Sequence, residues 1–547
     1  MDIYLYQLAS SRQLRLSVSI QVDVQFWQEK GVSIQSLYQV QSINQAVQLL
    51  KRSKCLSLLT PISFPSISLC WKEVQMIAKQ LYLQFQGRSL LAEELIRWLN
   101  GIDGQPQEEK YWAAIQYLFL LRKIQILPGV ESGGLAIFAK CNRCSAGHSW
   151  ITWRNCATCN GRCAMCQHCY FLGRSRSCAP LFLFAPSSAN KKRVSIRIRL
   201  PHRLTPGQHQ AASQIHQFLS SNQDQLLFWA VTGAGKTECL VPAIKKCLEQ
   251  GKKVLWVTPR KDVVLEVAPR LKQIFPTVYP IALYGGSTEH GRDRSLVIAT
   301  AHQALRFFRY FDLGIVDEAD AFPLFRNPML AAGIRRALTP TAKQILLTAT
   351  PPNTWKSLAR DGKCALVVLP NRYHGDPLPV PVLKKERRLW HKVADSQPVR
   401  TLEAFIQHVF NTDGQAILFV PRLQDLFLLH KWMVDRFAHK EVAGVYAQDP
   451  ERENKISQFR QGKIRFLIST TILERGVTVE RCHVAVVGAE HLIFDRATLI
   501  QIAGRVGRSA AYQHGVVWFI AQEKTDAPLH AIREIKKLNH CSKKAGF

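Results

Sequence analysis

A glycine-rich segment between a short apolar strand and a helical pattern places the strongest constraint on the fold. Residues 230–237 read AVTGAGKT. Gly233 and Gly235 allow backbone N–H groups to close around phosphate oxygens, where the start of a helix adds partial positive charge. Lys236 would meet the β- and γ-phosphates, and the Thr237 hydroxyl would complete a Mg²⁺ site. The segment therefore predicts a strand, a phosphate-binding loop and a helix in direct succession.

An apolar strand further along the chain ends in acidic residues. Residues 313–320 read LGIVDEAD, so a pair of carboxylates follows the strand directly. Asp317 is placed to hold Mg²⁺ through water, and Glu318 is placed to orient and deprotonate the attacking water. Phosphoryl transfer needs little from a protein beyond such positioning and charge neutralisation. The two segments together predict a site that binds and hydrolyses ATP with Mg²⁺.

Short apolar strands alternate with helical patterns from Leu204 onward, which is typical of parallel sheets covered by helices. The first set of predicted strands is Leu226–Val231, Lys253–Thr258, Leu296–Thr300, Leu313–Asp317 and Gln344–Thr348. After a joint with Pro377, Pro379 and Pro381 the pattern begins again, with strands at Ala416–Pro421, Val442–Tyr446, Ile464–Thr470, His483–Val487 and Gly515–Ile520. Two such units in tandem suggest a cleft between them.

The predicted fold class is therefore α/β, and a length of 547 residues leaves room for further parts at about 150 residues per domain. We expect two tandem parallel-sheet domains, preceded by a cysteine-rich module and an N-terminal region. The expected parts are an N-terminal region of unknown role at 1–138, the cysteine-rich module at 139–180, a basic strand with the first sheet domain at 181–380, and the second sheet domain at 390–547.

Two arginines in the second unit complete the candidate catalytic set. Residues 501–508 read QIAGRVGR, which places Arg505 and Arg508 three positions apart. Such arginines can reach across a cleft to a γ-phosphate and spread its developing charge, an effect worth roughly 10³–10⁵ in rate. They would also make hydrolysis depend on closure of the two units.

The excess of positive charge indicates which binding partners the protein attracts and says nothing of the fold. The chain carries 72 Lys and Arg against 40 Asp and Glu, a formal net charge of +32. Such a surface attracts polyanions, nucleic acid first and anionic lipid head groups second, although a basic surface without a dedicated ligand would give the same total. Residues 191–200 read KKRVSIRIRL, and their period of two predicts a strand with Arg193, Arg197 and Arg199 on one face. That face suits phosphates, and an ordinary solvated strand face is an equal alternative.

The chain shows no signal for membrane insertion or export. No run approaches the ~18 consecutive apolar residues that a membrane span needs. The N-terminus carries Asp2, Arg12 and Arg15 without an apolar block between a basic start and a cleavage site. We therefore expect neither an integral membrane protein nor a secreted one.

Eight of the 15 cysteines lie in one short segment, at positions 141, 144, 156, 159, 163, 166, 169 and 178. Without an export signal disulfides are disfavoured, and such clustering indicates metal ligation. Cys141 with Cys144 and Cys166 with Cys169 are knuckle pairs, each of which can give two thiolates to a tetrahedral Zn²⁺. Redox-active cysteines are a weaker alternative, because the paired spacing repeats too regularly.

The motifs together resemble those of superfamily 2 helicases of the DEAD/DEAH type and occur in the order of that family. They also include LTPGQ at 204–208, TPR at 258–260, TAT at 348–350 and TTILERGVT at 470–478. The finer pattern resembles the ComFA family of late competence proteins in naturally transformable Gram-positive bacteria, over roughly residues 80–547. The segments that carry this resemblance are DEADAFP at 317–323, RYHGDPLP at 372–379, residues 471–478 and the preceding cysteine pairs.

The resemblance implies roles for further residues. Gln208 would read the adenine edge, since an amide can pair with N6 and N7 together. Thr348 and Thr350 would link the state of the nucleotide to the grip on a nucleic-acid strand. The residues that would hold the backbone of that strand are Thr258, Arg260 and 299–303 in the first unit and Thr470, Thr471 and Arg475 in the second. Two such grips beside an ATP-gated cleft would form a ratchet.

The resemblance also implies how the cysteines pair. Residues 166–174 read CQHCYFLGR and resemble the closing half of the ComFA zinc finger, so that the expected zinc ligands are Cys141, Cys144, Cys166 and Cys169. A closed site with four thiolates is structural, because it leaves no position for a substrate. Cys156, Cys159 and Cys163 remain, with Cys178 or His148 as a fourth ligand of a second, nested zinc site such as those of the PriA replication-restart helicases.

The function that the resemblance implies is ATP-driven translocation of single-stranded DNA during the uptake of transforming DNA. The expected location is cytoplasmic, with peripheral attachment at the inner face of the membrane, beside the uptake channel and a phosphoribosyltransferase-like ComFC partner. Three rivals remain: a PriA-like helicase at stalled replication forks, a zinc-dependent DNA-binding scaffold with a vestigial ATPase, and an RNA helicase. The last is open because residues that grip a backbone discriminate sugars poorly.

Overall fold

In the computed structural model of the chain, the residues described are 1–52, 59–64, 69–103, 108–133, 138–159, 161–187, 193–287, 295–437, 441–471, 481–507 and 515–544. They divide into two compact bodies, whose bounds differ from those of the two sheet units expected above. The first body comprises residues 1–197, 247–316 and 321–344, and the second body comprises residues 198–246, 317–320 and 345–547. No helix among the described residues is long and apolar enough to cross a bilayer.

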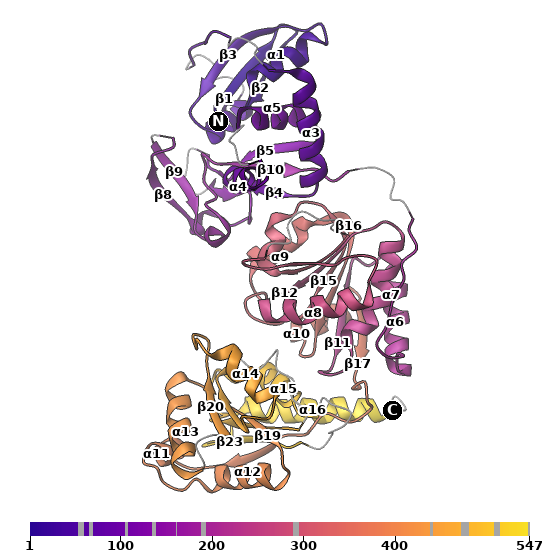
Figure 1. The fold of residues 1–547 in the computed structure, drawn as a ribbon, viewed down its shortest axis with the longest axis vertical. Helices are drawn as coiled ribbons and strands as arrows, with labels where there is room; N and C mark the ends of the chain where they lie inside the picture. The colour runs from indigo at the N-terminus through magenta and orange to yellow at the C-terminus, as the bar shows by residue number, and fades with distance from the viewer. Residues whose placement is uncertain are drawn as a thin grey trace. The chain divides into compact units, whose positions relative to one another are not determined.

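The chain begins with a small antiparallel sheet and its helices (Figure 1). The strand order is β2-β1-β3. Its elements are β1 (Ile3–Leu8), β2 (Ser11–Ser17), α1 (Ile20–Gln28), β3 (Ile34–Val40) and α2 (Ile43–Arg52). A second three-stranded sheet, β4-β10-β5, follows with three helices. Its elements are α3 (Trp71–Phe85), β4 (Ser89–Leu91), α4 (Ala92–Asp103), α5 (Glu108–Leu120), β5 (Ile124–Pro128) and β10 (Pro180–Phe184).

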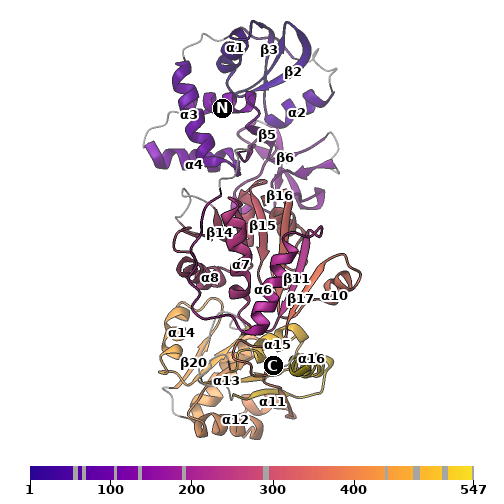
Figure 2. The ribbon, with the colours of Figure 1, turned by 90° about the vertical axis from the view of Figure 1, so that its right-hand side faces the viewer.

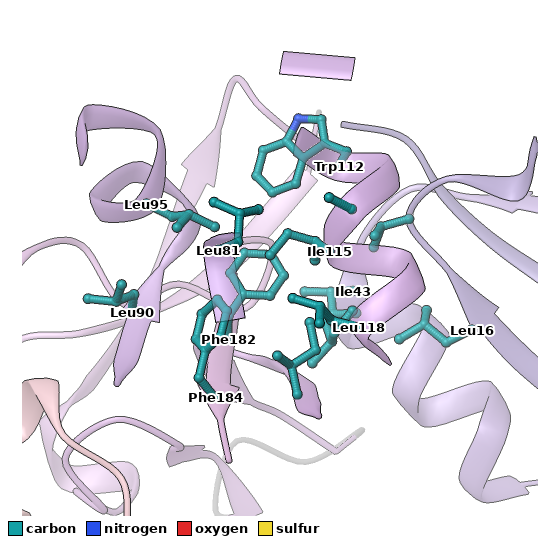
Figure 3. Close-up of a cluster of buried hydrophobic side chains, with 14 of the residues drawn as sticks. Leu16, Ile43, Leu81, Leu90, Leu95, Trp112, Ile115, Leu118, Phe182 and Phe184 are labelled. Atoms are coloured by element: carbon teal, nitrogen blue, oxygen red, sulfur yellow. The ribbon is translucent and has the colours of Figure 1, made fainter. Parts of the chain in front are cut away.

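A single apolar core joins these two sheets. Leu16 and Ile43 from the first sheet region pack in one cluster with Ile115 and Phe182 from the second (Figure 3). Phe182 and Phe184 are fully buried on β10, the central strand of its sheet. Removing so much apolar surface from water is the main favourable term in folding, and it makes the N-terminal region one packed body.

The cysteine-rich segment is an insertion between β5 and β10. It carries two short pairings, β6 with β7 and β8 with β9. Its elements are β6 (Val130–Glu131), β7 (Lys140–Cys141), the 3₁₀ turn η3 (His148–Trp150), β8 (Ile151–Cys156), β9 (Gly161–Cys166) and the 3₁₀ turn η4 (Tyr170–Leu172). Figure 1 shows the β8–β9 hairpin standing out from the β4-β10-β5 sheet.

The first large sheet has the strand order β13-β14-β12-β15-β16-β11-β17. β12 pairs in parallel with β14 and β15, β13 with β14, and β11 with β17. All five residues of β12 are buried, as expected for a strand covered on both faces. Its strands are β11 (Gln225–Ala230), β12 (Val254–Thr258), β13 (Ile281–Leu283), β14 (Leu296–Thr300), β15 (Phe311–Val316), β16 (Leu338–Thr348) and β17 (Ala365–Leu369).

The helices that accompany this sheet include α6 and α7, which lie side by side in both views (Figures 1 and 2). The helical segments are α6 (Pro206–Phe218), α7 (Lys236–Glu249), α8 (Lys261–Ile274), the 3₁₀ segment η5 (Ala301–Arg306), α9 (Pro328–Ala337) and α10 (Asn353–Arg360). The prediction of helices between parallel strands is confirmed here.

The second large sheet has the order β18-β23-β22-β19-β21-β20, and all its neighbouring strands are parallel. Its strands are β18 (Val382–Lys385), β19 (Gln415–Phe419), β20 (Val442–Val445), β21 (Phe466–Ser469), β22 (Cys482–Val487) and β23 (Val517–Ala521). Its helices are α11 (Leu389–Ala394), α12 (Arg400–Asn411), α13 (Leu423–Arg436), α14 (Arg452–Arg460), α15 (Arg496–Ala503) and α16 (Asp526–Lys544). The prediction of two tandem parallel-sheet domains is confirmed.

The predicted basic strand at 191–200 is wrong. Residues 193–200 form no strand, and residues 191–192 lie outside the described residues. Arg197 and Arg199 are exposed while Ile196 and Ile198 are half-buried, so the alternation of the sequence survives as alternation of exposure. A strand also needs a neighbouring backbone to pair with, and the alternation alone does not supply one.

Candidate active site and metal centres

The glycine-rich segment forms the loop between β11 and α7. Gly233 and Gly235 have positive φ angles of 80° and 75°, a region that suits glycine. Gly235 also has no room for a side chain, because a Cβ atom there would lie 2.3 Å from Nε2 of Gln208. Lys236 and Thr237 open α7, so their positions match the predicted phosphate-binding loop and helix start.

Gln208 braces this loop from α6. Its side-chain amide donates to the Ala234 carbonyl at 2.9 Å, and its amide oxygen accepts from the Thr205 N–H at 2.9 Å. The Thr205 hydroxyl accepts from the Gln208 N–H in return, which completes a capping box. The structure thus places Gln208 directly against the phosphate loop, and its contact with adenine stays a prediction.

The two predicted acidic residues follow β15 directly. Oδ1 of Asp317 accepts from the Glu318 backbone N–H at 2.9 Å. Glu318 has a φ of 50°, a left-handed conformation that costs a non-glycine residue roughly 1–2 kcal/mol. The next residue returns to the sheet, where the Ala319 N–H bonds to the Leu347 carbonyl of β16 at 3.0 Å. The strained turn therefore fixes the direction of the Glu318 backbone at the sheet end.

The TAT segment after β16 connects the acidic turn to α15. The Thr350 hydroxyl donates to Oδ2 of Asp320 at 2.5 Å. Gln501 donates its amide to the same Asp320 oxygen at 3.3 Å and to the Thr350 hydroxyl at 3.1 Å. On the other side the Trp229 indole of β11 donates to the Ala349 carbonyl at 3.1 Å. One hydrogen-bonded chain therefore runs from the strand before the phosphate loop to the helix before Arg505.

The turn after α15 lies against the phosphate loop. A Cβ atom at Gly504 would lie 1.9 Å from Oγ1 of Thr232, so only glycine permits this approach. Arg505 follows it and is buried, with 3% of its surface exposed. Arg508 lies outside the described residues. The geometry brings the chain around Arg505 to the loop that would hold the phosphates, and the catalytic roles of both arginines stay predictions.

Residues 372–376 tie these two loops together, a role that the sequence reasoning missed. Arg372 donates to the carbonyls of Gly507 at 2.6 Å and Gly504 at 3.3 Å. His374 contacts the same Gly507 carbonyl at 3.1 Å and Asp376 at 2.8 Å. The Tyr373 N–H donates to the Gly233 carbonyl at 3.0 Å. The RYHGDP letters were a signal of family membership, but nothing in their spacing indicated these backbone partners.

We expect the variant Arg372→Ala to lower the rate of ATP hydrolysis by up to about 10²-fold, because misplacing reactive groups by 1 Å can cost that much. Nucleotide affinity should change much less, since the phosphate loop itself is intact. The measurement is steady-state hydrolysis with nucleotide binding by fluorescence. Arg360→Ala, an exposed residue of α10, is the matched control. Equal rates in the two variants would contradict the positioning role.

The residues expected to hold a nucleic-acid strand lie at or after the ends of β12, β14 and β21. The Thr258 hydroxyl accepts from the Arg260 N–H at 3.3 Å, which forms a local turn at the end of β12. Thr300 precedes η5, and Gln303 within η5 is 6% exposed. Thr470 and Thr471 follow β21, and Arg475 lies outside the described residues. Their contacts with nucleic acid stay predictions.

The four cysteines expected to bind one zinc ion lie together. The sulfur atoms of Cys141, Cys144, Cys166 and Cys169 are all within 4.8 Å of one another, and all four residues are buried. The Cys141–Cys169 and Cys144–Cys166 sulfur distances are 3.8 and 3.6 Å. A tetrahedral site with Zn–S bonds of about 2.3 Å has edges of about 3.8 Å, so the thiols fit the ion. Hydrogen bonds from the neighbouring thiols, Cys144 first, hold the pKa of Cys141 well below its usual range.

The remaining cysteines form a second group of four. It consists of Cys156, Cys159, Cys163 and Cys178, and His148 is not part of it. Cys178 lies 3.8 Å from Cys156 and 3.6 Å from Cys163, sulfur to sulfur. The hydrogen bond from Cys178 lowers the pKa of Cys163 to about 4. This group is more exposed than the first, and it has the same geometry for a metal ion.

Three family models match successive parts of the chain. Residues 74–183 match the Competence protein ComFA N-terminal domain. Residues 201–353, which contain the phosphate loop and the acidic turn, match the Type III restriction enzyme, res subunit. Residues 399–510, which contain α15 and Arg505, match the Helicase conserved C-terminal domain.

Curated proteins and solved structures match larger stretches of the chain. The chain is 38% identical over 385 residues to the competence protein ComFA of Bacillus subtilis, covering 69% of this chain and 81% of that protein. It is 34% identical over 387 residues to ComFA of Streptococcus pneumoniae, covering 70% and 86%. Among solved structures, S. cerevisiae Dbp5 bound to RNA and ADP BeF3 is 16% identical with a TM-score of 0.45, covering 61% of this chain and 91% of that one.

Proposed function

Since this chain belongs to the ComFA family of competence proteins, we propose that it moves along single-stranded DNA and drives the import of transforming DNA. The chain is an ATP-hydrolysing helicase of superfamily 2, with two RecA-like domains and the ComFA N-terminal domain before them. The nucleic acid along which the protein moves and its biological task are the parts that go beyond that assignment.

The observation that carries the proposal is the closed chain of contacts between the phosphate loop and α15. Gly504 touches Thr232, and the Gln501 side chain donates to both the Asp320 carboxylate and the Thr350 hydroxyl. A change at the γ-phosphate would therefore alter the position of α15. Thr470 and Thr471, which follow β21 in the same sheet domain as α15, would hold the nucleic-acid strand. Such contacts between a nucleotide site and a second sheet are what a ratchet needs, because closing and opening then follow binding and hydrolysis.

The residues divide the hydrolytic work between them. Gly233, Gly235 and Lys236 would cradle the phosphates, while Thr237 and, through water, Asp317 would hold Mg²⁺, which neutralises phosphate charge. Glu318 would accept the proton of the attacking water, held in place by its strained turn. Arg505, buried beside Gly504, would stabilise the charge that develops on the γ-phosphate.

The decisive experiment compares ATP hydrolysis by the purified chain with single-stranded DNA, double-stranded DNA and RNA. We expect single-stranded DNA to stimulate hydrolysis most, with an affinity that falls by roughly 0.7 log units per log unit of salt for each contacted phosphate. Stimulation by RNA alone would instead identify an RNA helicase. Absence of any stimulation would favour a binding scaffold.

The biological part of the proposal has its own test. Deletion of the gene should abolish transformation and leave growth unchanged, whereas a PriA-like role at replication forks would impair growth and show strand displacement on forked DNA. The same proposal places the protein at the inner face of the membrane, beside the uptake channel and a ComFC-like partner. Its net charge of +32 supports attraction to anionic lipid head groups.

We also propose that both groups of four cysteines bind Zn²⁺, which predicts about two equivalents of zinc per chain by elemental analysis. The double variant Cys163→Ser with Cys178→Ser should retain one equivalent, because the first group keeps all its thiols. A content of one in the unaltered chain, with no loss in that variant, would contradict a second site.

A further inference from the structure

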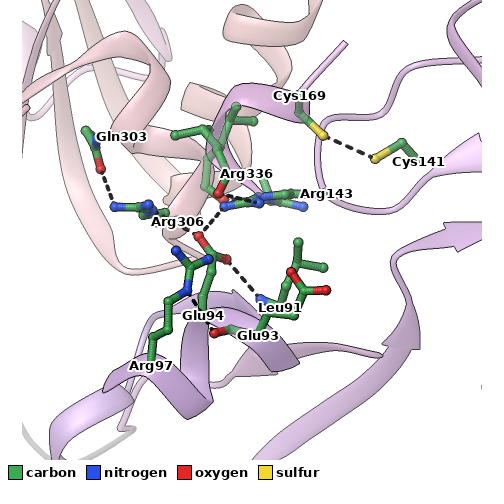
Figure 4. A network of polar contacts seen from close by, with 12 residues as sticks. Leu91, Glu93, Glu94, Arg97, Cys141, Arg143, Cys169, Gln303, Arg306 and Arg336 are labelled. Atoms are coloured by element: carbon green, nitrogen blue, oxygen red, sulfur yellow. Dashed lines mark hydrogen bonds and ion pairs between the residues drawn. The ribbon is translucent and has the colours of Figure 1, made fainter. Parts of the chain in front are cut away.

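Two arginine side chains, Arg143 and Arg306, bind one glutamate beside the first group of cysteines (Figure 4). Glu94, in the first turn of α4, has only 5% of its surface exposed. One of its carboxylate oxygens accepts from Arg143 at 2.8 Å and from Arg306 at 3.2 Å, and the other accepts from the Leu91 N–H at 3.0 Å. Arg143 lies between the ligand candidates Cys141 and Cys144. The glutamate therefore connects the metal centre to η5.

Arg336, from α9, makes the second connection. It donates to the Asn142 carbonyl at 2.6 Å and to the Leu305 carbonyl at 2.7 Å. One guanidinium thus links the turn between Cys141 and Cys144 to η5. Arg306 in turn donates to the Gln303 side chain at 3.0 Å, and the Phe171 ring meets the His302 ring edge-on at 4.7 Å. These contacts with η5 come from the cysteine-rich segment, α4 and α9, and all lie within residues 1–197, 247–316 and 321–344.

Arg143, Arg306 and Arg336 bring three positive charges to this cluster, and Glu94 brings one negative charge. Four thiolates around Zn²⁺ would carry a formal charge of about −2. That charge would lie beside Arg143, in the turn between Cys141 and Cys144, and beside Arg336, which bonds to the same turn.

We propose that Glu94, Arg143 and Arg336 are positioning residues through which the Cys141–Cys169 metal centre holds η5 in the position that contacts a nucleic-acid strand. Arg306 passes this constraint to Gln303, one of the residues expected to contact the nucleic-acid backbone. Without the metal ion the turn from Cys141 to Cys144 loses its bonds to zinc, so that the Arg143 guanidinium and the Asn142 carbonyl are no longer held in place. The segment 301–306 then loosens, and the affinity for nucleic acid falls.

The inference rests on the proposed function, so its first test does not require activity. Hydrogen exchange of the backbone at 299–307 is measured in the full-length protein with zinc and after treatment with a chelator. We expect exchange to become about tenfold faster on zinc removal, a coupling within the usual range. The double variant Cys163→Ser with Cys178→Ser serves as control, because it leaves the first group of cysteines and the turn between Cys141 and Cys144 unchanged.

The second test uses Glu94→Gln, which keeps the shape of the side chain and all eight clustered cysteines. The DNA concentration for half-maximal stimulation of ATP hydrolysis should rise about tenfold, with the rate at saturating DNA and the basal rate retained. Glu93→Gln is the matched control, since Glu93 precedes Glu94 in the sequence, and its carboxylate pairs with Arg176 and is 43% exposed. Arg336→Lys should act like Glu94→Gln, because an amine does not reproduce the planar fork, whereas Arg335→Lys on the same helix should not.

Two results would overturn the inference: exchange at 299–307 that ignores zinc, or equal DNA affinities in Glu94→Gln and Glu93→Gln. A wild-type protein that no nucleic acid stimulates would refute the proposed function instead, and the exchange measurement would still decide the coupling.

Discussion

Replacing Lys236 with alanine should reduce ATP hydrolysis by at least about 10²–10³-fold, the usual effect of removing one group that stabilises developing charge. Lys236 opens α7 directly after the positive-φ glycines, at the position where the loop pattern requires a cation for the terminal phosphates. The measurement is phosphate release at saturating ATP, with and without single-stranded DNA. Binding of DNA in the absence of nucleotide should persist.

The control for this variant is Lys246→Ala on the same helix, whose amine bonds to the exposed Ser220 hydroxyl at 3.3 Å. It removes the same charge from α7 and leaves the phosphate loop intact, so hydrolysis should remain near the wild-type rate. Hydrolysis that survives in Lys236→Ala would mean that the measured activity does not come from this site.

The variant Glu318→Gln should lower hydrolysis by about 10²–10⁴-fold, the range that general base catalysis contributes. Unlike Lys236→Ala, it should still bind ATP tightly, because the phosphate loop and Asp317 are unchanged. The amide keeps the hydrogen-bonding shape of the carboxylate at a backbone position that is already strained. We therefore expect a protein that binds both ATP and DNA and releases neither quickly.

Nucleotide binding and single-turnover hydrolysis, measured side by side, separate this outcome from simple loss of the site. Glu266→Gln, an exposed carboxylate of α8, is the matched control and should be silent. If Glu318→Gln failed to bind ATP, the acidic turn would be supporting the loop rather than activating water.

The buried strands of the two large sheets could be predicted because each one is a short apolar run between helical patterns. β14 has the predicted bounds, Leu296–Thr300, and β22 differs from its prediction by one residue. The edge strands β17 and β18 were not predicted. β17 alternates buried and exposed residues, and β18 has no buried residue, so neither carries the apolar run that identifies a central strand.

Features that depend on distant partners could not be read from local patterns. Residues 193–200 alternate like a strand, yet they lack a strand pairing. The choice between Cys178 and His148 depended on β9 and the segment before β10 meeting in space, which spacing does not encode. The bonds from Arg372 to Gly504 and Gly507 span more than a hundred residues and involve backbone carbonyls. Every residue has such a carbonyl, so the sequence does not show which of them accepts a hydrogen bond.

Pro128 and Pro180 are register partners where β5 and β10 run antiparallel. The cysteine-rich segment leaves the sheet and returns to it at this single point, so in chain topology it is an elaborated hairpin loop. Its outer part, the β8–β9 arm, could change in length without disturbing β5 and β10, provided that it still brought Cys156 and Cys163 to the second group of cysteines. The inner part could not, because any replacement would have to deliver a guanidinium to Glu94 and a carbonyl to Arg336.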